Sequence, residues 1–386
     1  MSRQLAAPAA KLSTRMNTKT RLGNSLHQRL HQLRVEEKCN RVLKLGLDVH
    51  YRQVTVAMQE EAGAIKAVGR MGHEGFGNWV ERKSKAGWDI YSCYEAGASG
   101  YWLHRELEQL GIKNLVVAPK AMGQDKGQKT DRRDSAELVD QLDRYLRGNH
   151  KALSAVAIPT PEQEEKRALL RYHRQIMADR SRYEARGKGL LCAQGIEVQG
   201  KWWQPQVWKE LKTHPRLKGW METQLKSWRR KLLSAEQEQQ KLRKQIEALA
   251  PAVLPKGVGA YSAVALEYEL KGLARFKTAR ALSSYTGLCP GIHSSNGQGK
   301  EGSINRCGNA AVRWNLVEMV WRLLKWQPDY EPVRQLGVGL VRSRRARKRL
   351  AVKAARQLAI DLWRLETGRA TAQELGLILQ PRAKRK

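Results

Sequence analysis

The sequence is short of acidic residues, of phenylalanine and of long hydrophobic runs. Asp and Glu number 37 against 71 Lys and Arg, so the formal net charge is +34, and only two residues are Phe. Such an excess of positive charge repels itself unless a polyanion neutralises it. The sequence therefore predicts a nucleic acid partner. Its 12 Trp and 11 Tyr offer stacking surfaces for bases, although we expect most of them in the core.

Cysteine is also scarce, and its spacing excludes two classes of protein. The five residues contain no CxxC pair and are Cys39, Cys93, Cys192, Cys289 and Cys307. Neither a zinc ribbon nor a disulfide framework is indicated, and a reducing compartment fits. No apolar run reaches the roughly 18 residues that a membrane span needs. We expect a cytoplasmic protein of bacterial type, associated with the nucleoid and without a membrane partner.

The first residues of the chain lack acids altogether until Glu36. Residues 1–40 are predicted to form a basic extension that is disordered and follows a nucleic acid backbone. An organellar transit peptide has a similar composition and is the less favoured alternative.

Hydrophobic periodicity predicts an α/β domain over residues 41–150. The expected strands are 42–49, 53–58, 64–71, 89–96 and 114–119, and the expected helices are 75–86, 100–111 and 131–147. Three strands followed by alternating helices and strands give a mixed sheet, in the order of RuvC-like and ribonuclease-H-like folds. We therefore predict that fold class for this domain.

The remainder of the chain is expected to be mainly helical. Residues 151–250 begin with a linker and contain two long, charge-rich segments nearly free of helix breakers, the second a candidate coiled coil. Such helices either pack on their own domain or form a partner interface. Residues 251–386 are predicted to form a C-terminal domain with a basic amphipathic tail.

The stretch KTDRRDSAEL at 129–138 opens the helix expected at 131–147. With Asp131 at zero and about 100° per residue, Asp134 lies near −60°, and Leu138 and Leu142 lie within roughly 40° of zero. These two acids share the apolar face that should pack on the sheet. Either they cap the helix start or they bind a metal ion.

The other acids of this helix are expected to face solvent. Glu137 lies about 120° from Asp131, and Asp140 and Asp143 point to roughly the opposite side. Arg132 and Arg133 flank the inward pair and are candidates to touch a phosphate.

Two further acids end predicted strands. Asp48 closes LKLGLDV and Glu95 closes IYSCYEA. An acid on an otherwise apolar strand is costly unless it is paired, hydrogen-bonded or bound to a cation. If the first and fourth strands are neighbours, both acids converge with Asp131 and Asp134. Two Mg²⁺ ions about 4 Å apart would relieve the repulsion of four carboxylates and support cleavage of a phosphodiester.

A third constellation is GLCPGIHSSNGQGKEGSINRCGN at 287–309. Its Gly, Ser and Asn content predicts a loop whose serines are turn residues. A serine can nevertheless attack phosphorus when bases hold the scissile phosphate, and Lys300 and Arg306 lie close by in sequence. His293 is either a proton acceptor or a surface residue. The esterase pattern GxSxG is absent.

Taken together, these passages resemble insertion-sequence transposases of the one-ten type, which have a RuvC-like DEDD domain and a C-terminal serine domain. The similar passages are GLDVHYRQVTVAM, YEAGASGYWL, KTDRRDSAEL and YTGLCPGIHSSNGQGKEGSINRCGN, within residues 42–330. The resemblance implies a DNA recombinase that is guided by an RNA encoded by the element. It further implies that the helical middle mediates RNA binding and assembly into a dimer or tetramer.

The resemblance also implies a role for particular residues. Asp48, Glu95, Asp131 and Asp134 match the four acids that bind Mg²⁺, and Ser295 matches the nucleophile that becomes joined to DNA. Members usually have Gly directly after that serine, whereas Asn296 follows Ser295 here, so Ser294 is the alternative register.

Three functions are weighed on these observations. The leading hypothesis is a transposase that cuts and rejoins DNA with a Mg²⁺-binding carboxylate cluster and Ser295. A RuvC-like junction nuclease would use water in place of the serine. A non-catalytic scaffold would bind nucleic acid and use the acids only as caps and buried pairs, although a binder of polyanions has no reason to bury acids.

Overall fold

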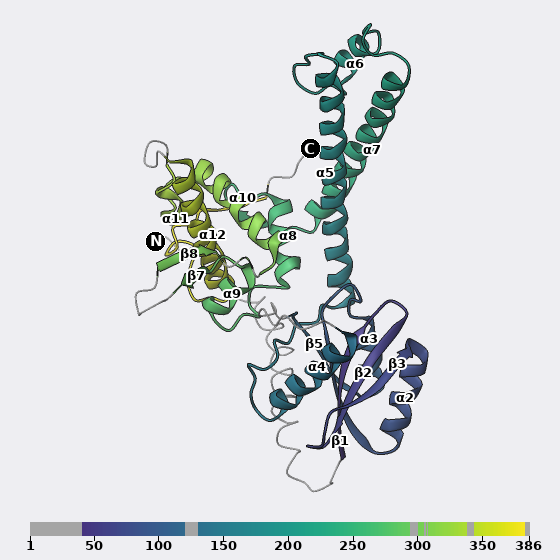
Figure 1. Ribbon diagram of the computed structural model, residues 1–386. Coiled ribbons are helices and arrows are strands. Elements are labelled where there is room, and N and C mark those ends of the chain that lie inside the picture. The colour runs from purple at the N-terminus through teal and green to yellow at the C-terminus, as the bar shows by residue number, and fades with distance from the viewer. Residues whose placement is uncertain are drawn as a thin grey trace, which may run out of the picture. The chain divides into compact units, whose positions relative to one another are not determined.

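The structure, a computed structural model, describes residues 41–119, 130–293, 300–304, 306, 308–337 and 343–382. The predicted extension 1–40 lies outside these residues. The chain forms two compact units, Met1–Ile158 and Pro159–Lys386, and each is described by itself (Figure 1). Within the described part of the chain, none of the helices has the length and apolar character that a bilayer crossing requires.

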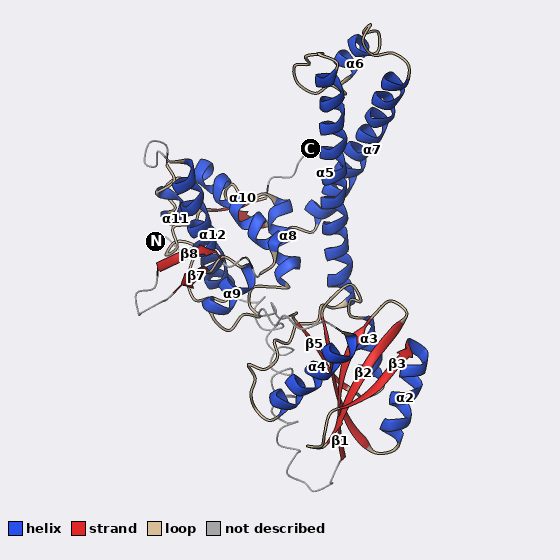
Figure 2. Ribbon diagram, viewed as in Figure 1, coloured by secondary structure: helices blue, strands red, loops and turns tan. Residues whose placement is uncertain are grey.

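The first unit is a five-stranded mixed sheet with helices, as Figure 2 shows. Its elements are β1 (Arg41–Val49), β2 (Gln53–Glu60), β3 (Lys66–Gly72), α2 (His73–Lys85), β4 (Trp88–Glu95), α3 (Trp102–Gln109), β5 (Lys113–Val117) and α4 (Asp131–Leu146). The strand order is β3-β2-β1-β4-β5. β1, β2 and β3 are antiparallel, whereas β4 pairs in parallel with both β1 and β5. The predicted mixed sheet and its element order are confirmed.

Strand β1 separates two packing layers because its side chains alternate between the faces of the sheet. On one face its leucines join a core with α2 and α3, and this core includes Leu43, Leu45, Leu47, Phe76, Val80, Leu103 and Leu107. The opposite face carries Lys44, Gly46 and Asp48. That face is covered by α4, whose Leu138 and Leu142 pack with residues of β4 and β5.

Gly46 lets α4 lie directly on β1. A Cβ atom built at Gly46 would lie 2.1 Å from the carbonyl oxygen of Ser135 and 2.8 Å from the backbone nitrogen of Val139. No side chain fits in that space unless the helix moves. The glycine therefore sets the distance between the helix and the strand that carries Asp48.

Replacing Gly46 by Val is expected to destabilise the first unit by about 1–3 kcal/mol or more, because overpacking forces the backbones apart. Chemical denaturation of the full chain and hydrogen exchange in β1 would measure the loss. Gly77→Ala in α2 is the matched control. An added Cβ there meets nothing within 4 Å, so it should be neutral or stabilise by up to about 1 kcal/mol. A Gly46→Val protein as stable as the wild type would contradict the close packing.

Asp143 departs from the prediction that it faces solvent. It is buried, binds the ammonium group of Lys44 and lies 2.9 Å from Nε of Arg147. Burial alone would raise the pKa of Asp143, but the hydrogen bond and charge of Lys44 outweigh it, with help from Arg147, and the pKa is lowered. The prediction was wrong because Lys44 faces the helix and a buried ammonium group needs an anion.

The second unit contains a long helical hairpin and a bundle of shorter helices. Its elements are α5 (Pro161–Ala193), α6 (Pro205–Leu211), α7 (Trp220–Ala248), β6 (Val253–Pro255), α8 (Ala260–Leu270), α9 (Ala279–Thr286), β7 (Pro290–His293), β8 (Lys300–Ile304), α10 (Ala310–Trp326), α11 (Glu331–Arg334), α12 (Arg344–Glu366) and β9 (Leu379–Pro381). α5 and α7 lie side by side (Figure 1). The two charge-rich helices therefore pack against each other within the chain, which is one of the two arrangements expected for them.

The tip of this hairpin buries aromatic side chains. Trp202 and Trp203 are fully buried, and a Cβ atom at Gly187 of α5 would lie 2.1 Å from the Trp202 ring. Gly187 thus leaves room for the indole. For these two tryptophans the expected core role is confirmed.

Residues 287–309 are not the uninterrupted loop that their composition predicts. β7 and β8 pair in antiparallel fashion, with Pro290 opposite Ile304 and His293 opposite Lys300. The loop prediction was wrong at these two strands because Gly and Ser are tolerated in a short two-stranded ribbon whose pairing is set by the backbone.

Candidate active site

Two of the predicted site residues end neighbouring strands. β1 and β4 run in parallel, and Leu47 pairs with Tyr94. Asp48 and Glu95 are the next residues on the two strands. Gly46, two positions before Asp48, and Cys93, two positions before Glu95, both face α4. Because side chains repeat every second residue along a strand, both acids are placed on the face covered by α4. The assumption that the first and fourth strands are neighbours is confirmed.

The start of α4 brings a third acid to the end of β1. Asp131 Oδ2 lies 3.4 Å from His50 Nε2, and the same nitrogen lies 3.1 Å from Asp48 Oδ2. Asp48, His50 and Asp131 each offer a ligand atom, and these atoms lie within 4.8 Å of one another. Arg70 Nη2 lies 3.0 Å from Asp131 Oδ2. Two carboxylates and an imidazole therefore share one small space.

The pKa of Asp48 is raised by its surroundings. Burial is the largest cause, the charges of Asp131 and Asp134 act in the same direction, and His50 opposes them. Asp134 thus contributes to the electric field at Asp48. The side chains of Asp48 and Asp131 are 25% and 34% exposed, so a substrate in solution can reach them. Carboxylates that lie this close together favour a bound cation.

The geometry of the helix start bears on the capping alternative. The N-cap residue of α4 is Thr130, and it makes no side-chain capping hydrogen bond. Asp131 is the first helical residue and contacts Arg70 and His50 instead. Its side chain is therefore directed to the cluster rather than to the helix's own N–H groups. Arg132 and Arg133 are exposed on the same turn.

Sequence reasoning missed His50 and Arg70. His50 follows β1 and lies outside the apolar alternation that singled out Asp48. Arg70 is placed by strand register, because Asp48 pairs with Thr55 and Thr55 pairs with Arg70. Arg70 could have been found from the sequence only by predicting the pairing register of β1, β2 and β3.

The second unit contains the predicted serine segment. Ser294 and Ser295 lie outside the described residues, and they follow β7 directly in the sequence. Lys300 belongs to β8, and its side chain lies outside the description as well. Arg306 is exposed and has a positive φ of 57°.

Two glycines hold the base of the β7–β8 hairpin together. A Cβ atom at Gly308 would lie 2.2 Å from the carbonyl oxygen of Tyr285 and 2.3 Å from the backbone nitrogen of Gly287. Gly287 itself has a positive φ of 66° and ends α9. The segments before and after the hairpin are therefore in backbone contact, which fixes where the hairpin begins and ends.

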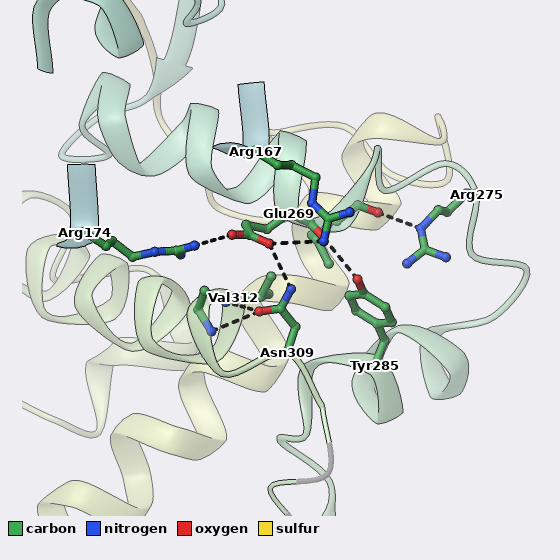
Figure 3. A network of polar contacts seen from close by, with 9 residues as sticks. Arg167, Arg174, Glu269, Arg275, Tyr285, Asn309 and Val312 are labelled. Carbon is green, nitrogen blue, oxygen red and sulfur yellow. Dashed lines mark hydrogen bonds and ion pairs between the residues drawn. The ribbon is translucent and has the colours of Figure 1, made fainter. Parts of the chain in front are cut away.

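A buried carboxylate supports the end of this hairpin (Figure 3). Glu269 of α8 is 2% exposed. Its oxygens lie 2.5 Å from Arg174 Nη2 and 3.7 Å from Arg167 Nη2, both on α5. Asn309 donates to Glu269 at 3.2 Å and accepts from two backbone N–H groups at the start of α10. We call these four residues the Glu269 network, and it joins α5, α8 and the start of α10.

Comparison with known families matches both units. Residues 45–193 match the profile of DEDD transposases of the IS110 type, and residues 255–333 match the profile described as the transposase IS116/IS110/IS902 family. The first match includes Asp48, Glu95, Asp131 and Asp134, and the second includes the serine segment. A DEDD transposase domain implies a divalent metal.

Individual relatives agree with the profiles. The chain is 30% identical over 262 residues to y4rJ of Sinorhizobium fredii, a transposase by name, over 61% of this chain and 65% of that protein. It is 27% identical over 248 residues to y4qE of the same organism, over 60% of this chain and 58% of that protein. Each of these matches thus covers less than two thirds of the relative.

A more distant relative extends the match to most of the chain. The transposase for insertion sequence element IS1111A of Coxiella burnetii is 22% identical over 368 residues, which cover 91% of this chain and 98% of that protein. The predicted resemblance is thereby confirmed: the chain matches two transposase profiles of the IS110 type, one in each part of the chain, and relatives that carry transposase names.

Proposed function

We propose that the protein is a transposase that excises and inserts a mobile element by cutting and rejoining DNA. The observation that carries this proposal is the cluster of Asp48, His50 and Asp131 at the β1 end and the α4 start, whose ligand atoms lie within 4.8 Å of one another. Glu95 ends the neighbouring strand β4. The net charge of +34 supports a nucleic acid substrate. The sheet order supports a ribonuclease-H-like nuclease domain.

The carboxylate cluster has the chemistry of a Mg²⁺ site. Hard oxygen donors suit Mg²⁺, and the ligand atoms of Asp48, His50 and Asp131 lie within 4.8 Å of one another. Asp48, Glu95, Asp131 and Asp134 are the proposed ligands, with His50 in contact with two of them. When bound, Mg²⁺ would supply Lewis-acid stabilisation of charge on the phosphodiester oxygens.

The protein's own groups would bind and orient the DNA. Arg132 and Arg133, exposed on the first turn of α4, are proposed to hold phosphates beside the carboxylates. Ser295 is proposed to attack phosphorus, so that an Oγ–P bond forms and the bond to the leaving deoxyribose oxygen breaks. The serine hydroxyl loses its proton in this step and the leaving oxygen takes one up, so protons balance. Lys300 and Arg306 would neutralise the same phosphate. Guidance by an element-encoded RNA and assembly into a dimer or tetramer stay predictions from the family resemblance.

Incubation with Mg²⁺, DNA from the element end and any RNA encoded beside it should yield a protein–DNA adduct that survives detergent. We expect the adduct with wild type and with Ser294→Ala, and none with Ser295→Ala. Gel electrophoresis of end-labelled DNA would measure it.

Two results would favour the competing functions. Cleaved DNA without any adduct would favour a nuclease that uses water, whereas normal recombination by Ser295→Ala would contradict the serine mechanism. Tight binding without cleavage under every metal condition would favour a scaffold.

A further inference from the structure

Aromatic side chains gather at the edge of the sheet that carries the carboxylates. Tyr51 lies in the turn between β1 and β2, three residues after Asp48, and the residue is 93% exposed. His73 begins α2 directly after β3, whose last residue, Gly72, pairs with Gln53 beside that turn. Trp102 begins α3 and is 37% exposed, and its ring meets the His73 ring edge-on with centroids 4.9 Å apart.

The turn that presents Tyr51 is held by hydrogen bonds on both sides. The backbone nitrogen of His50 donates to the carbonyl oxygen of Gln53 at 2.9 Å. The carbonyl oxygen of Tyr51 lies 3.1 Å from His73 Nε2. Ser99, on the segment before α3, donates to the carbonyl oxygen of Val49 at 2.9 Å. The ring of Tyr51 is thus exposed on a fixed backbone, which lowers the entropic cost of binding against it.

The surroundings of Tyr51 indicate what kind of group it meets. Its neighbour Arg52 is exposed, and Arg70 on β3 contacts Asp131. A protein partner would have to cover these charges, together with the partly exposed carboxylates, at a desolvation cost. A nucleic acid offers phosphates for the arginines and a flat base for the tyrosine. Because Asp48 is only three residues away, that base would belong to the strand being cut.

We propose that Tyr51 is a substrate-positioning residue that stacks on an unpaired DNA base next to the phosphodiester held by the carboxylate cluster, with Trp102 at the same edge. This rests on the proposed function. Stacking on Tyr51 would fix the register of the strand relative to Asp48. The step involves no bond making, so it can be tested apart from cleavage.

The test uses the full chain and a 20-nucleotide oligothymidylate that carries one central 2-aminopurine. Stacking on an aromatic ring quenches 2-aminopurine fluorescence, so wild type and Tyr51→Phe are expected to quench it. Tyr51→Leu keeps apolar bulk without a ring and is expected to lose the quenching. Its dissociation constant, from fluorescence anisotropy, should rise about 5- to 150-fold, the range measured for loss of one base–aromatic stack.

Matched measurements separate this inference from its alternatives. Tyr172→Leu, at another exposed tyrosine, should retain the quenching. The inference would be overturned if Tyr172→Leu and Tyr51→Leu lost the quenching equally, or if Tyr51→Leu still quenched the probe. Quenching of the matching RNA probe alone would also overturn it. The quenching is measured with Ca²⁺ as the metal ion, without cleavage of the DNA. Failure of the transposase proposal would therefore appear as absent cutting, with the quenching intact.

Discussion

Asp48→Asn is expected to lower the rate of DNA cleavage by at least about 100-fold. Asp48 shares the His50 nitrogen with Asp131 of the α4 start, so the change removes one negative charge from the proposed Mg²⁺ site. Cleavage of end-labelled element DNA in single-turnover reactions would measure the loss. Asp131→Asn should act similarly, because its carboxylate shares His50 with Asp48.

Without metal, Asp48→Asn should not destabilise the folded protein but slightly stabilise it. The pKa of Asp48 is raised in the folded protein, so the ionised carboxylate is less favourable there than in the unfolded chain. Stability linked to this group is present at acid pH and is lost as pH rises through the folded pKa. Asn carries no charge, so Asp48→Asn should melt at a slightly higher temperature than wild type at neutral pH in EDTA.

Magnesium should reverse that order. A ligand at 100 times its dissociation constant stabilises the folded state by about 2.7 kcal/mol. We expect this gain for wild type and much less of it for Asp48→Asn, so the two melting curves should cross as Mg²⁺ is added. The crossing cannot arise from misfolding, because a misfolded variant would melt lower at every concentration.

Asp140→Asn is the matched control for these measurements. Asp140 lies on the same helix and pairs at the surface with Arg144, 2.7 Å away. Its replacement should change cleavage and the Mg²⁺ response little, because an exposed pair within one helix contributes about 0.3–0.5 kcal/mol. If Asp48→Asn behaved like Asp140→Asn, the metal site would have to lie elsewhere.

The sequence allowed the elements of the first unit to be predicted because periodicity carries that information. The alternation in β1 placed Leu43, Leu45 and Leu47 on one face, and that is where the structure has them. The same alternation, continued to Asp48, singled out the acid at the strand end. Local patterns were sufficient here because a strand buried on one face by leucines has a single favourable orientation.

Interactions between distant segments could not be predicted in the same way. Asp143 looked like a surface acid on its own helix, and only the packing of α4 over β1 brings it to Lys44, 99 positions earlier. Gly46 has no periodic signature, yet it decides how closely that helix approaches. His50 and Arg70 join the acids through a turn and a strand register. Each case depends on tertiary contacts that a one-dimensional pattern does not contain.

Glu269→Gln is expected to destabilise the second unit by about 3–5 kcal/mol, since removing one partner of a buried ion pair leaves the other charge uncompensated. Here the uncompensated groups would be Arg174 and the buried Arg167. Gln has one acceptor oxygen where Glu has two, so Asn309 would compete with Arg174 for it, and some of the order at the start of α10 would be lost. Chemical denaturation would give the free energy of unfolding, and hydrogen exchange would locate the loss in α8 and α10.

The pH dependence follows from the sign of the pKa shift. Burial would raise the pKa of Glu269, but the hydrogen bond and charge of Arg174 outweigh it, with Asn309 and Arg167, and the pKa is lowered. The network therefore stabilises the fold fully above the ordinary glutamate pKa, and this contribution disappears as pH falls through the folded pKa. The difference between wild type and Glu269→Gln should shrink in acid.

Two variants distinguish the network from general damage to α8. Glu267→Gln changes an acid two residues away whose pKa is raised by burial and by Glu366, so it should be neutral or slightly stabilising. The double variant Arg174→Met with Glu269→Met removes both charges and should recover part of the stability lost in Glu269→Gln, because apolar groups of similar size can replace a buried ion pair. If the double variant were less stable than Glu269→Gln, the uncompensated charge of Arg174 would not be the cause of the loss, and the packing of the carboxylate side chain itself would be.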